Sequence, residues 1–249
     1  MPIITIAAQK GGVGKTATTA ALGAGLRNRG RSVLYIDLDP QANLSAQLRA
    51  SRGLSVADIL TGKAKAQSAI QHTAQGDIIP ADARLSTKGF LYGRGDERLL
   101  RQALEPLQSK YDFILIDTPP SLGALTVSAM TAAKWALLPA KADRFSLDAL
   151  REVTGTIREI QVHSNRDLQI LGVVITMYNA RTTVSKLIRE KLTAQAEELG
   201  VSIYDPPIRR SVAIEEAEIT GTIYDSKNNA REDYDLLIDH ILQRIEKGR

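Results

Sequence analysis

The chain has 249 residues, of which 43% are hydrophobic and 24% are charged, ordinary values for a soluble globular protein of one large domain or two small ones. It contains no cysteine, which excludes disulfides and thiolate metal sites and favours a reducing cytoplasm. The net charge of +4 arises in residues 1–140, where 16 Lys and Arg face 10 Asp and Glu, whereas residues 141–249 hold 16 against 18. This imbalance suits a polyanionic partner, although most imbalances of this size are solvated surface.

Apolar runs alternate with amphipathic stretches along the whole chain. Strands are expected at residues 3–8, 32–37, 77–80, 113–117, 135–140, 168–176 and 201–204. Helices are expected at residues 16–29, 55–60, 97–109, 122–133, 146–163, 182–199 and 229–246. This order predicts an α/β fold, a mostly parallel twisted sheet flanked by helices on both faces, with ligands at the carboxyl ends of the strands. Because no linker or repeat interrupts the pattern, residues 1–249 are predicted to form a single domain.

A glycine-rich loop, KGGVGKT, follows the first predicted strand and precedes a helix rich in alanine and leucine. In this context the backbone N–H groups of the loop converge on one point, with the positive end of the helix dipole behind them. Lys15 is then expected to reach the β- and γ-phosphates, and the Thr16 hydroxyl to bind Mg²⁺. An ordinary glycine turn is the alternative, but it does not require the flanking strand and helix. The loop predicts that the chain binds a nucleoside triphosphate.

Two carboxylates, Asp37 and Asp39, come at the end of the second predicted strand, in DLDPQAN. Residues two apart project from the same face of an extended strand. Beside Mg²⁺ and phosphate, such a carboxylate holds metal-bound water or orients the attacking water. The alternative is that both aspartates only cap a proline turn.

The apolar strand at residues 113–117 ends in Asp117, as expected of the second magnesium-supporting element of a P-loop ATPase. The stiff turn that follows, TPPS, suits a segment that distinguishes ATP from ADP. Apolar strands also end in Asp for capping alone. The combination with Lys15 and Thr16 favours the functional interpretation.

Together, KGGVGKT, DLDPQAN and ILIDTPPS resemble the deviant Walker A ATPases, specifically the ParA/Soj partition branch, with MinD as a close relative. The resemblance covers nearly the whole chain, and its motifs are highly specific. It includes GRGDERLL at residues 93–100, SLG at residues 121–123 and TMYN at residues 176–179. Lys10, at the front of the loop, matches the signature lysine of the family.

The resemblance implies a P-loop ATPase with ATP and Mg²⁺ as cofactors. In this family the lysine matched by Lys10 reaches the nucleotide of a partner subunit, which implies a homodimer with ATP sandwiched at the interface. The implied catalytic residues are Lys10, Lys15 and Asp39, and the implied metal-binding residues are Thr16, Asp39 and Asp117. The implied ATP-binding residues are Lys10, Gly11, Gly12, Val13, Gly14, Lys15, Thr16, Ala17, Asn179 and Pro207. Asn179 can also be the N-cap of the helix that follows it, and both roles can coexist.

The ParA branch further implies non-specific DNA binding by the ATP-bound dimer and a ParB-like, centromere-binding activator, and hence a cytoplasmic, nucleoid-associated protein. The cations expected to contact DNA phosphates are Arg181, Lys186, Arg189, Lys191, Arg209 and Arg210. Ala213 departs from the family, because many chromosomal members have a DNA-contacting arginine at this position. The chain enters its first strand at once, so no N-terminal helix-turn-helix extension is expected. The implied function is partition of a plasmid, a chromosome or a mobile element.

Two alternatives stay open. A MinD-like or cargo-positioning ATPase would act on a membrane or a protein instead of DNA. Residues 235–249 have apolar side chains at helical spacing, but their polar positions include acids, which favours a helix packed on the sheet over a membrane-binding one. We expect no transmembrane segment and no signal peptide. A metabolic enzyme on the same scaffold is the other alternative: the cluster cysteines of a nitrogenase-reductase relative are absent, and an amidotransfer synthetase lacks a visible nucleophile.

Overall fold

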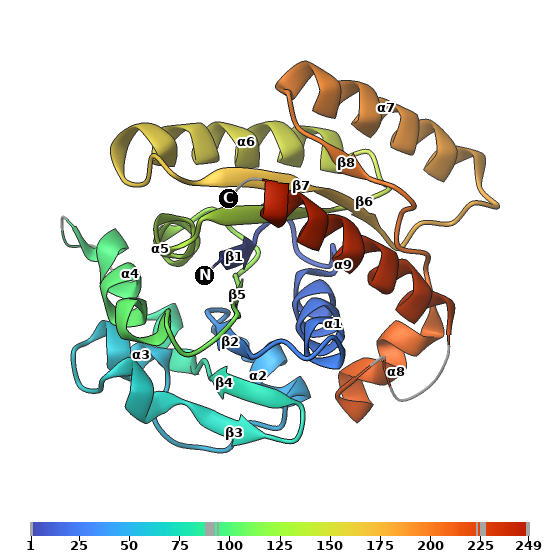
Figure 1. Ribbon diagram of the computed structural model, residues 1–249. Coiled ribbons are helices and arrows are strands. Elements are labelled where there is room, and N and C mark those ends of the chain that lie inside the picture. Colours follow the sequence, from blue (N-terminus) through green and yellow to red (C-terminus); the bar gives the residue numbers. More distant parts are fainter. Residues whose placement is uncertain (1, 88–92, 94, 223, 225–227, 248–249) are drawn as a thin grey trace.

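A computed structural model describes residues 2–87, 93, 95–222, 224 and 228–247. In these residues eight strands form one sheet in the order β3-β4-β2-β5-β1-β6-β7-β8 (Figure 1). The strands are β1 (Ile3–Ile6), β2 (Val33–Asp37), β3 (Gln71–Thr73), β4 (Gly76–Ile79), β5 (Phe113–Asp117), β6 (Trp135–Lys141), β7 (Gln169–Thr176) and β8 (Ile203–Tyr204). All neighbours pair in parallel except β3, which is antiparallel to β4.

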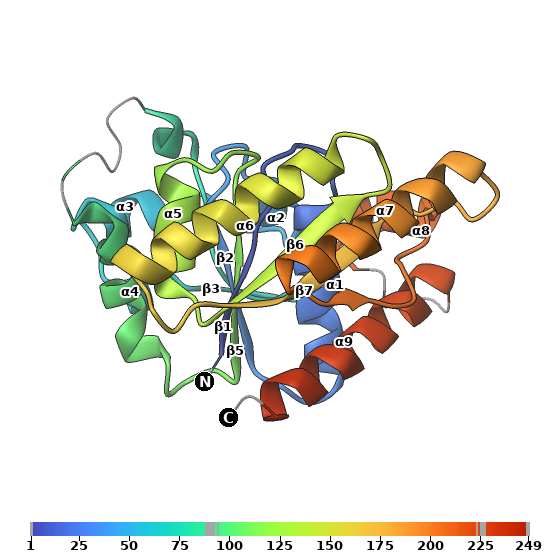
Figure 2. The ribbon, with the colours of Figure 1, turned by 90° about the horizontal axis from the view of Figure 1, so that it is seen from above.

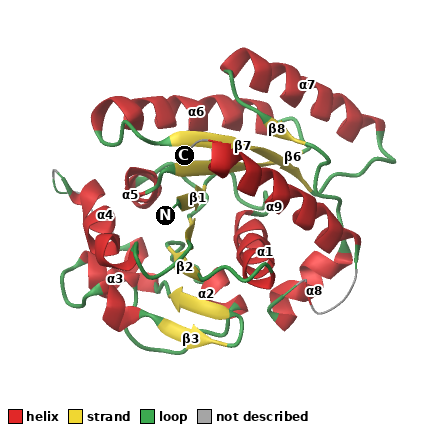
Figure 3. Ribbon diagram, viewed as in Figure 1, coloured by secondary structure: helices red, strands yellow, loops and turns green. Residues whose placement is uncertain are grey.

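Helices cover both faces of the sheet (Figures 1, 2 and 3). One face carries α1 (Lys15–Asn28), α2 (Asn43–Gln47), α8 (Val212–Thr220) and α9 (Asn229–Lys247). The other carries α3 (Val56–Leu60), α4 (Leu99–Leu104), α5 (Ala124–Ala132), α6 (Ser146–His163) and α7 (Thr183–Leu199). Short 3₁₀ helices lie at Ala66–Ala69, Ala83–Ser86, Asp96–Arg98 and Glu105–Leu107.

Each face of the sheet has its own apolar core. Leu34 and Ile36 of β2 pack in the cluster formed with α3 to α7, whereas Val33 and Tyr35 pack with α1, α2, α8 and α9. Successive side chains of a strand point to opposite faces, so a strand covered on both sides is apolar at nearly every position. This explains why the strands read as continuous apolar runs rather than as alternating patterns.

The strand register brings three strand ends together. Ile6 of β1 pairs with Asp117 of β5, and Asp117 pairs with Asp37 of β2. Because these strands are parallel, the segments that follow them leave from one edge of the sheet. The glycine-rich loop and both acidic segments therefore meet at this edge.

The predicted fold class is confirmed, and all seven predicted strands are present. β1 ends at Ile6 instead of residue 8, and β8 begins at Ile203 instead of residue 201. The helix predicted at residues 97–109 is divided into Asp96–Arg98, α4 and Glu105–Leu107. Pro106 explains the division near its end, because proline cannot donate a helical hydrogen bond. Arg94, within the matching segment 93–100, lies outside the described residues.

Among the α-helices and strands, three were not predicted: α2, β3 and α8. α2 and β3 are only five and three residues long, too short for a periodic pattern. α8 carries a usable signal, because the Ser211 side chain accepts a hydrogen bond from the N–H of Ala213 as an N-cap. None of the described helices is both long and apolar enough to span a bilayer.

Candidate functional site

The loop between β1 and α1 keeps its backbone donors available to a ligand. Gly12 and Gly14 have φ angles of 67° and 79°, in the left-handed region that favours glycine. α1 begins at Lys15 without a side-chain cap and without an acidic residue in its first turn. The first N–H groups of α1, and the positive end of its dipole, can therefore bind an anion.

Lys15 is a buried cation with 7% of its surface exposed. Its Nζ donates a hydrogen bond to the carbonyl of Lys10 at 3.2 Å. Burial lowers the pKa of Lys15, and the charges of Asp117 and Asp39 act in the opposite direction without restoring it. A phosphate group beside Nζ would stabilise its charged form, so Lys15 is suited to an anionic ligand.

Asp117, at the end of β5, is fully buried beside α1. Its Oδ2 accepts a hydrogen bond from the Thr16 hydroxyl at 2.7 Å, and its Oδ1 accepts one from Thr19 at 3.3 Å. Burial raises the pKa of Asp117, and the neighbouring Asp37 carboxylate adds to the rise. A divalent cation would offset the repulsion between the carboxylates of Asp37 and Asp117. Thr19 was not predicted, although its position three residues after Thr16 puts both hydroxyls on one helix face.

Asp37 and Asp39 have separate environments, unlike the shared face that the strand pattern predicted. Asp37 is fully buried and accepts hydrogen bonds from the Ser45 hydroxyl at 2.7 Å, the Ser45 N–H at 2.8 Å and the Asp39 N–H at 3.0 Å. Asp39 leaves the strand and lines a cavity. The chain turns after Asp37, so the two-residue spacing no longer sets the direction of the Asp39 carboxylate. Asp37 thus fixes the segment that positions Asp39.

A cavity of about 490 Å³ lies between the loop, α2 and α8. Its lining residues are Gly11, Gly12, Gly14, Lys15, Thr16, Ala17, Asp39, Gln41, Asn43, Ala46, Gln47, Pro120, Met177 and Glu218. The cavity thus unites the loop with Asp39 and with the turn after β5. Gln47 and Glu218 were not predicted, because nothing in the sequence places α2 beside α8. The Gln47 side chain joins these two helices by donating to the carbonyl of Ala217 at 3.1 Å.

Lys10 does not line this cavity. Its Nζ donates to Oδ2 of Asp143 at 2.6 Å and lies 4.9 Å from the ring centroid of Phe145. Neither partner was predicted. A signal was present for Asp143, because it closely follows the strand at residues 135–140 and so lies near the same edge of the sheet as Lys10.

Asn179 and Pro207 lie apart from the lining of the cavity, in segments that meet beside β7. Tyr178 forms an isolated bridge with Arg209, which brings the two segments together. The N-cap prediction for Asn179 is wrong: Thr182 caps α7, and Asn179 instead accepts from the N–H of Arg181 at 3.0 Å. Residues 180 and 181, between Asn179 and Thr182, form a turn before the helix.

Two of the six DNA-contact candidates already have acidic partners. Arg189 pairs with Asp205 at 2.5 Å, and Arg209 pairs with the buried carboxylate of Asp233 at 2.7 Å. Lys186 and Arg210 are exposed, and no ion pair is found for either within the described part of the chain. Arg181 and Lys191 are likewise exposed and without an ion pair among the described residues, so Arg189 and Arg209 are the two candidates whose charge is already matched.

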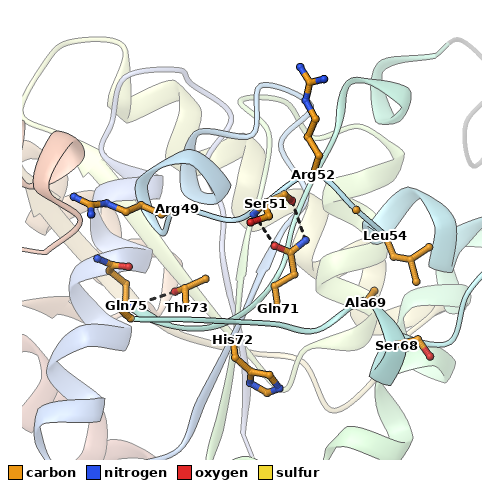
Figure 4. A pocket seen from close by; sticks show the side chains of 12 residues that line it. Arg49, Ser51, Arg52, Leu54, Ser68, Ala69, Gln71, His72, Thr73 and Gln75 are labelled. Atoms are coloured by element: carbon orange, nitrogen blue, oxygen red, sulfur yellow. Dashed lines mark hydrogen bonds between the residues drawn. The ribbon is translucent and has the colours of Figure 1, made fainter.

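Another cavity, of about 500 Å³, lies between residues 49–54 and β3. Gln71 spans it, because its side chain bonds both the N–H and the carbonyl of Ser51 (Figure 4). The side chains of Arg49 and Arg52 point away from each other in Figure 4, so they are not placed to bind the same anionic group. We assign it no chemistry.

Comparison with known proteins places this geometry in a family. A family model described as an AAA domain matches residues 1–170. The "Chromosome partitioning protein ParA" of Caulobacter vibrioides is 38% identical, over 97% of this chain and 94% of that protein. The "Sporulation initiation inhibitor protein Soj" of Bacillus subtilis is 36% identical, over 93% and 94% respectively. The chain belongs to the ParA/Soj family.

A solved structure extends this similarity. The cobyrinic acid a,c-diamide synthase of Mycobacterium smegmatis, with bound ADP and magnesium, has a TM-score of 0.87 and 31% identity, and the match covers 100% of this chain and 97% of that one. The ParA/Soj fold of the present chain is therefore shared with a nucleotide-binding protein along its whole length.

The oxygen atoms of this ParA/Soj site fit magnesium. Thr16 and Asp117 are hydrogen-bonded to each other, and Asp39 lines the same cavity. Hydroxyl and carboxylate oxygens are ligands that Mg²⁺ accepts. The described residues contain no group of three His, Cys, Asp or Glu side chains able to hold a metal ion by themselves. A magnesium ion here would need phosphate and water oxygens as well, which is the usual coordination beside a bound nucleotide.

Proposed function

We propose that the chain is a Mg²⁺-dependent ATPase of the ParA type. The observation that carries the proposal is the meeting of Lys15, Thr16, Asp39 and Asp117 at one edge of the sheet, around a cavity that opens on the glycine-rich loop. Its relative from Mycobacterium smegmatis, solved with ADP and magnesium, supports the choice of ligands.

In this proposal the chain's own groups bind and orient the triphosphate. The loop N–H groups and Lys15 bind its phosphates, while Thr16 and Asp117 hold the magnesium ion with Asp39 near it. The bound ion would neutralise charge that develops on the phosphate oxygens. Asp39 orients the water that attacks the terminal phosphate, and Asp37 holds the Asp39 backbone in place. Hydrolysis to ADP and phosphate is slow in the isolated chain, because positioning is incomplete without a partner.

The proposed assembly is a homodimer with ATP between the subunits. Lys10 supplies the positive charge that each subunit lends to the nucleotide of the other. A cation donated by a second subunit neutralises phosphate charge only after the subunits meet, so ATP stabilises the dimer. The name of the ParA relative, a chromosome partitioning protein, supports a partition function for the chain. Asn179 and the backbone at Pro207 are proposed to contact the adenine.

The ATP-bound dimer is proposed to bind DNA without sequence preference and to be released when a ParB-like activator stimulates hydrolysis. This cycle would partition a chromosome, a plasmid or a mobile element in a cytoplasmic, nucleoid-associated setting. Lys186 and Arg210, together with Arg181 and Lys191, are the favoured DNA contacts, because these four lack acidic partners among the described residues, whereas Arg189 and Arg209 have them.

A cargo-positioning ATPase is the second candidate, supported by the acidic character of α8. Glu215, Glu216 and Glu218 lie on α8, which has no basic residue. DNA phosphates would be repelled by this helix, whereas a protein surface with basic residues would not. A diamide synthase is less well supported, because the chain has no cysteine to act as the nucleophile of glutamine-dependent amide transfer.

A DNA titration in three nucleotide states tests the proposal. Random-sequence DNA is titrated with protein in ATP and Mg²⁺, in ADP and Mg²⁺, and without nucleotide, each across a salt series. We expect binding only with ATP, weakening as salt rises because phosphate contacts release counterions. Binding to protein cargo or anionic vesicles with ATP, but not to DNA, would replace the partition function by the second candidate.

A further inference from the structure

Lys10 is held by contacts within its own chain. Its ammonium lies 2.6 Å from Asp143 and over the Phe145 ring, on the segment between β6 and α6. We call Asp143 and Phe145 the Lys10 clamp. The side chains of Lys10 and Asp143 are 34% and 26% exposed, so the ion pair is partly shielded from water.

The clamp is fixed at its base. Oδ1 of Asp143 accepts from the N–H and the hydroxyl of Ser146, both at 3.2 Å, at the start of α6. The other oxygen, Oδ2, is left for Lys10. Burial alone would raise the pKa of Asp143, but the hydrogen bond and charge of Lys10, with smaller contributions from Ser146 and Lys141, outweigh it and the pKa is lowered.

Phe145 completes the arrangement. It is 67% exposed. The face of an aromatic ring attracts a cation within about 6 Å, and Nζ of Lys10 lies within this range. The ring and the carboxylate therefore hold one ammonium from two directions.

We propose that Asp143 and Phe145 are positioning residues that store Lys10 in the isolated chain and must release it before Lys10 can bind a triphosphate across the dimer. The inference rests on the proposed ATP-dependent dimer. A two-fold dimer requires two such releases. Breaking a partly exposed ion pair within a subunit is expected to weaken dimerisation by about threefold. Because both subunits break one, the dimer dissociation constant is raised about tenfold.

Asp143→Asn is the decisive variant, because asparagine keeps an oxygen for the Ser146 cap but loses the charge that holds Lys10. Asp148→Asn is the matched control: it removes the same charge from an exposed position in the first turn of α6. Both are made in an Asp39→Ala background to block hydrolysis, and dimerisation is measured by sedimentation equilibrium with ATP and Mg²⁺. We expect the dissociation constant to fall about tenfold for Asp143→Asn and to stay unchanged for Asp148→Asn.

A second measurement needs no nucleotide and no dimer. The rate at which an acylating reagent modifies Lys10 is followed by mass spectrometry, with the exposed Lys63 and Lys65 as internal references. Release from the clamp should raise the Lys10 rate in Asp143→Asn, and to a smaller extent in Phe145→Leu, because a held ammonium is shielded from the reagent.

The two measurements separate the possible failures. An unchanged Lys10 labelling rate in both variants overturns the clamp. Faster labelling combined with unchanged or weaker dimerisation overturns its role as a threshold, and means that Asp143 has no effect on dimerisation or supports it. If the Asp39→Ala parent stays monomeric with ATP, the proposed function fails while the labelling result still decides whether Asp143 holds Lys10.

Discussion

Single residues in the cavity carry separable tasks. Lys15 is buried, and the charges of Asp117 and Asp39 do not restore its pKa to the ordinary value. Asp39 lines the cavity, and its backbone N–H is bonded to Asp37. Substituting the first should therefore affect binding, and substituting the second should affect turnover.

Lys15→Ala is expected to weaken ATP binding by at least about tenfold, because it removes charge-assisted hydrogen bonds worth about 1.5–3 kcal/mol. A titration with a fluorescent ATP analogue measures the change. Lys63→Ala, on the exposed surface, is the control and should bind normally. Normal affinity in Lys15→Ala would refute the assignment of the loop.

Asp39→Ala is expected to bind ATP and accumulate as a dimer, with turnover reduced at least about a hundredfold, the usual size of a lost proton-transfer or water-orienting group. Steady-state phosphate release and sedimentation measure the two effects. Turnover at the wild-type rate would remove Asp39 from the mechanism.

At the scale of elements, α2 is tied to the sheet through Ser45. Its hydroxyl donates to Asp37 and accepts from the N–H of Ala81 beyond β4. Ser45→Ala leaves both groups without this partner, and we expect the free energy of unfolding to fall by about 1–3 kcal/mol. Urea denaturation measures the loss. The control is Ser51→Ala, where the backbone and not the side chain bonds Gln71, and it should change stability little.

α3 is joined to the segment after β4 by Arg84, which bonds both Asp58 and Asp82. The hydrogen bond from Arg84 lowers the pKa of Asp58 to about 2. A depressed pKa stabilises the folded state above the ordinary carboxyl range, and this contribution is lost as pH falls from about 4 to about 2.

Arg84→Met should therefore be less stable than the wild type at pH 7, and the difference should shrink as the pH falls towards 2. Denaturant titrations at several pH values measure it. A difference that does not change with pH would show that Arg84 acts by packing alone.

At the scale of the whole molecule, the basic residues considered for DNA binding divide into those with an acidic partner and those with no ion pair among the described residues. Arg209→Ala should lower stability by at least about 1 kcal/mol, because Asp233 is 3% exposed and loses its charged partner. Lys186→Glu combined with Arg210→Glu should instead leave stability nearly unchanged and weaken ATP-dependent DNA binding. Thermal denaturation and DNA titration across salt separate the two classes. Equal DNA affinity in the double variant would move the contact surface elsewhere.

The sequence predicted the central architecture because strands buried on both faces leave long apolar runs, and the phosphate-binding loop has a fixed spacing. The meeting of the loop with Asp39 and Asp117 followed from parallel topology. The environment of Asp37, the capture of Lys10 by Asp143 and the partners of Arg189 and Arg209 depend on contacts between distant segments, which no local pattern contains. The single-domain organisation and the roles of the site residues stay predictions.

The hydroxyl of Thr176, at the end of β7, donates to the carbonyl of Val13 in the glycine-rich loop at 2.8 Å. The glycine-rich loop is therefore hydrogen-bonded to the end of β7, the strand that continues into Asn179 and Arg181. A shift of the loop when its pocket fills would then move the end of β7 and the exposed turn at residues 180–181 that follows it. The signal of a spectroscopic probe attached at position 181 would then change when the pocket is filled. Thr176→Val removes the hydrogen bond to Val13 and should abolish this change.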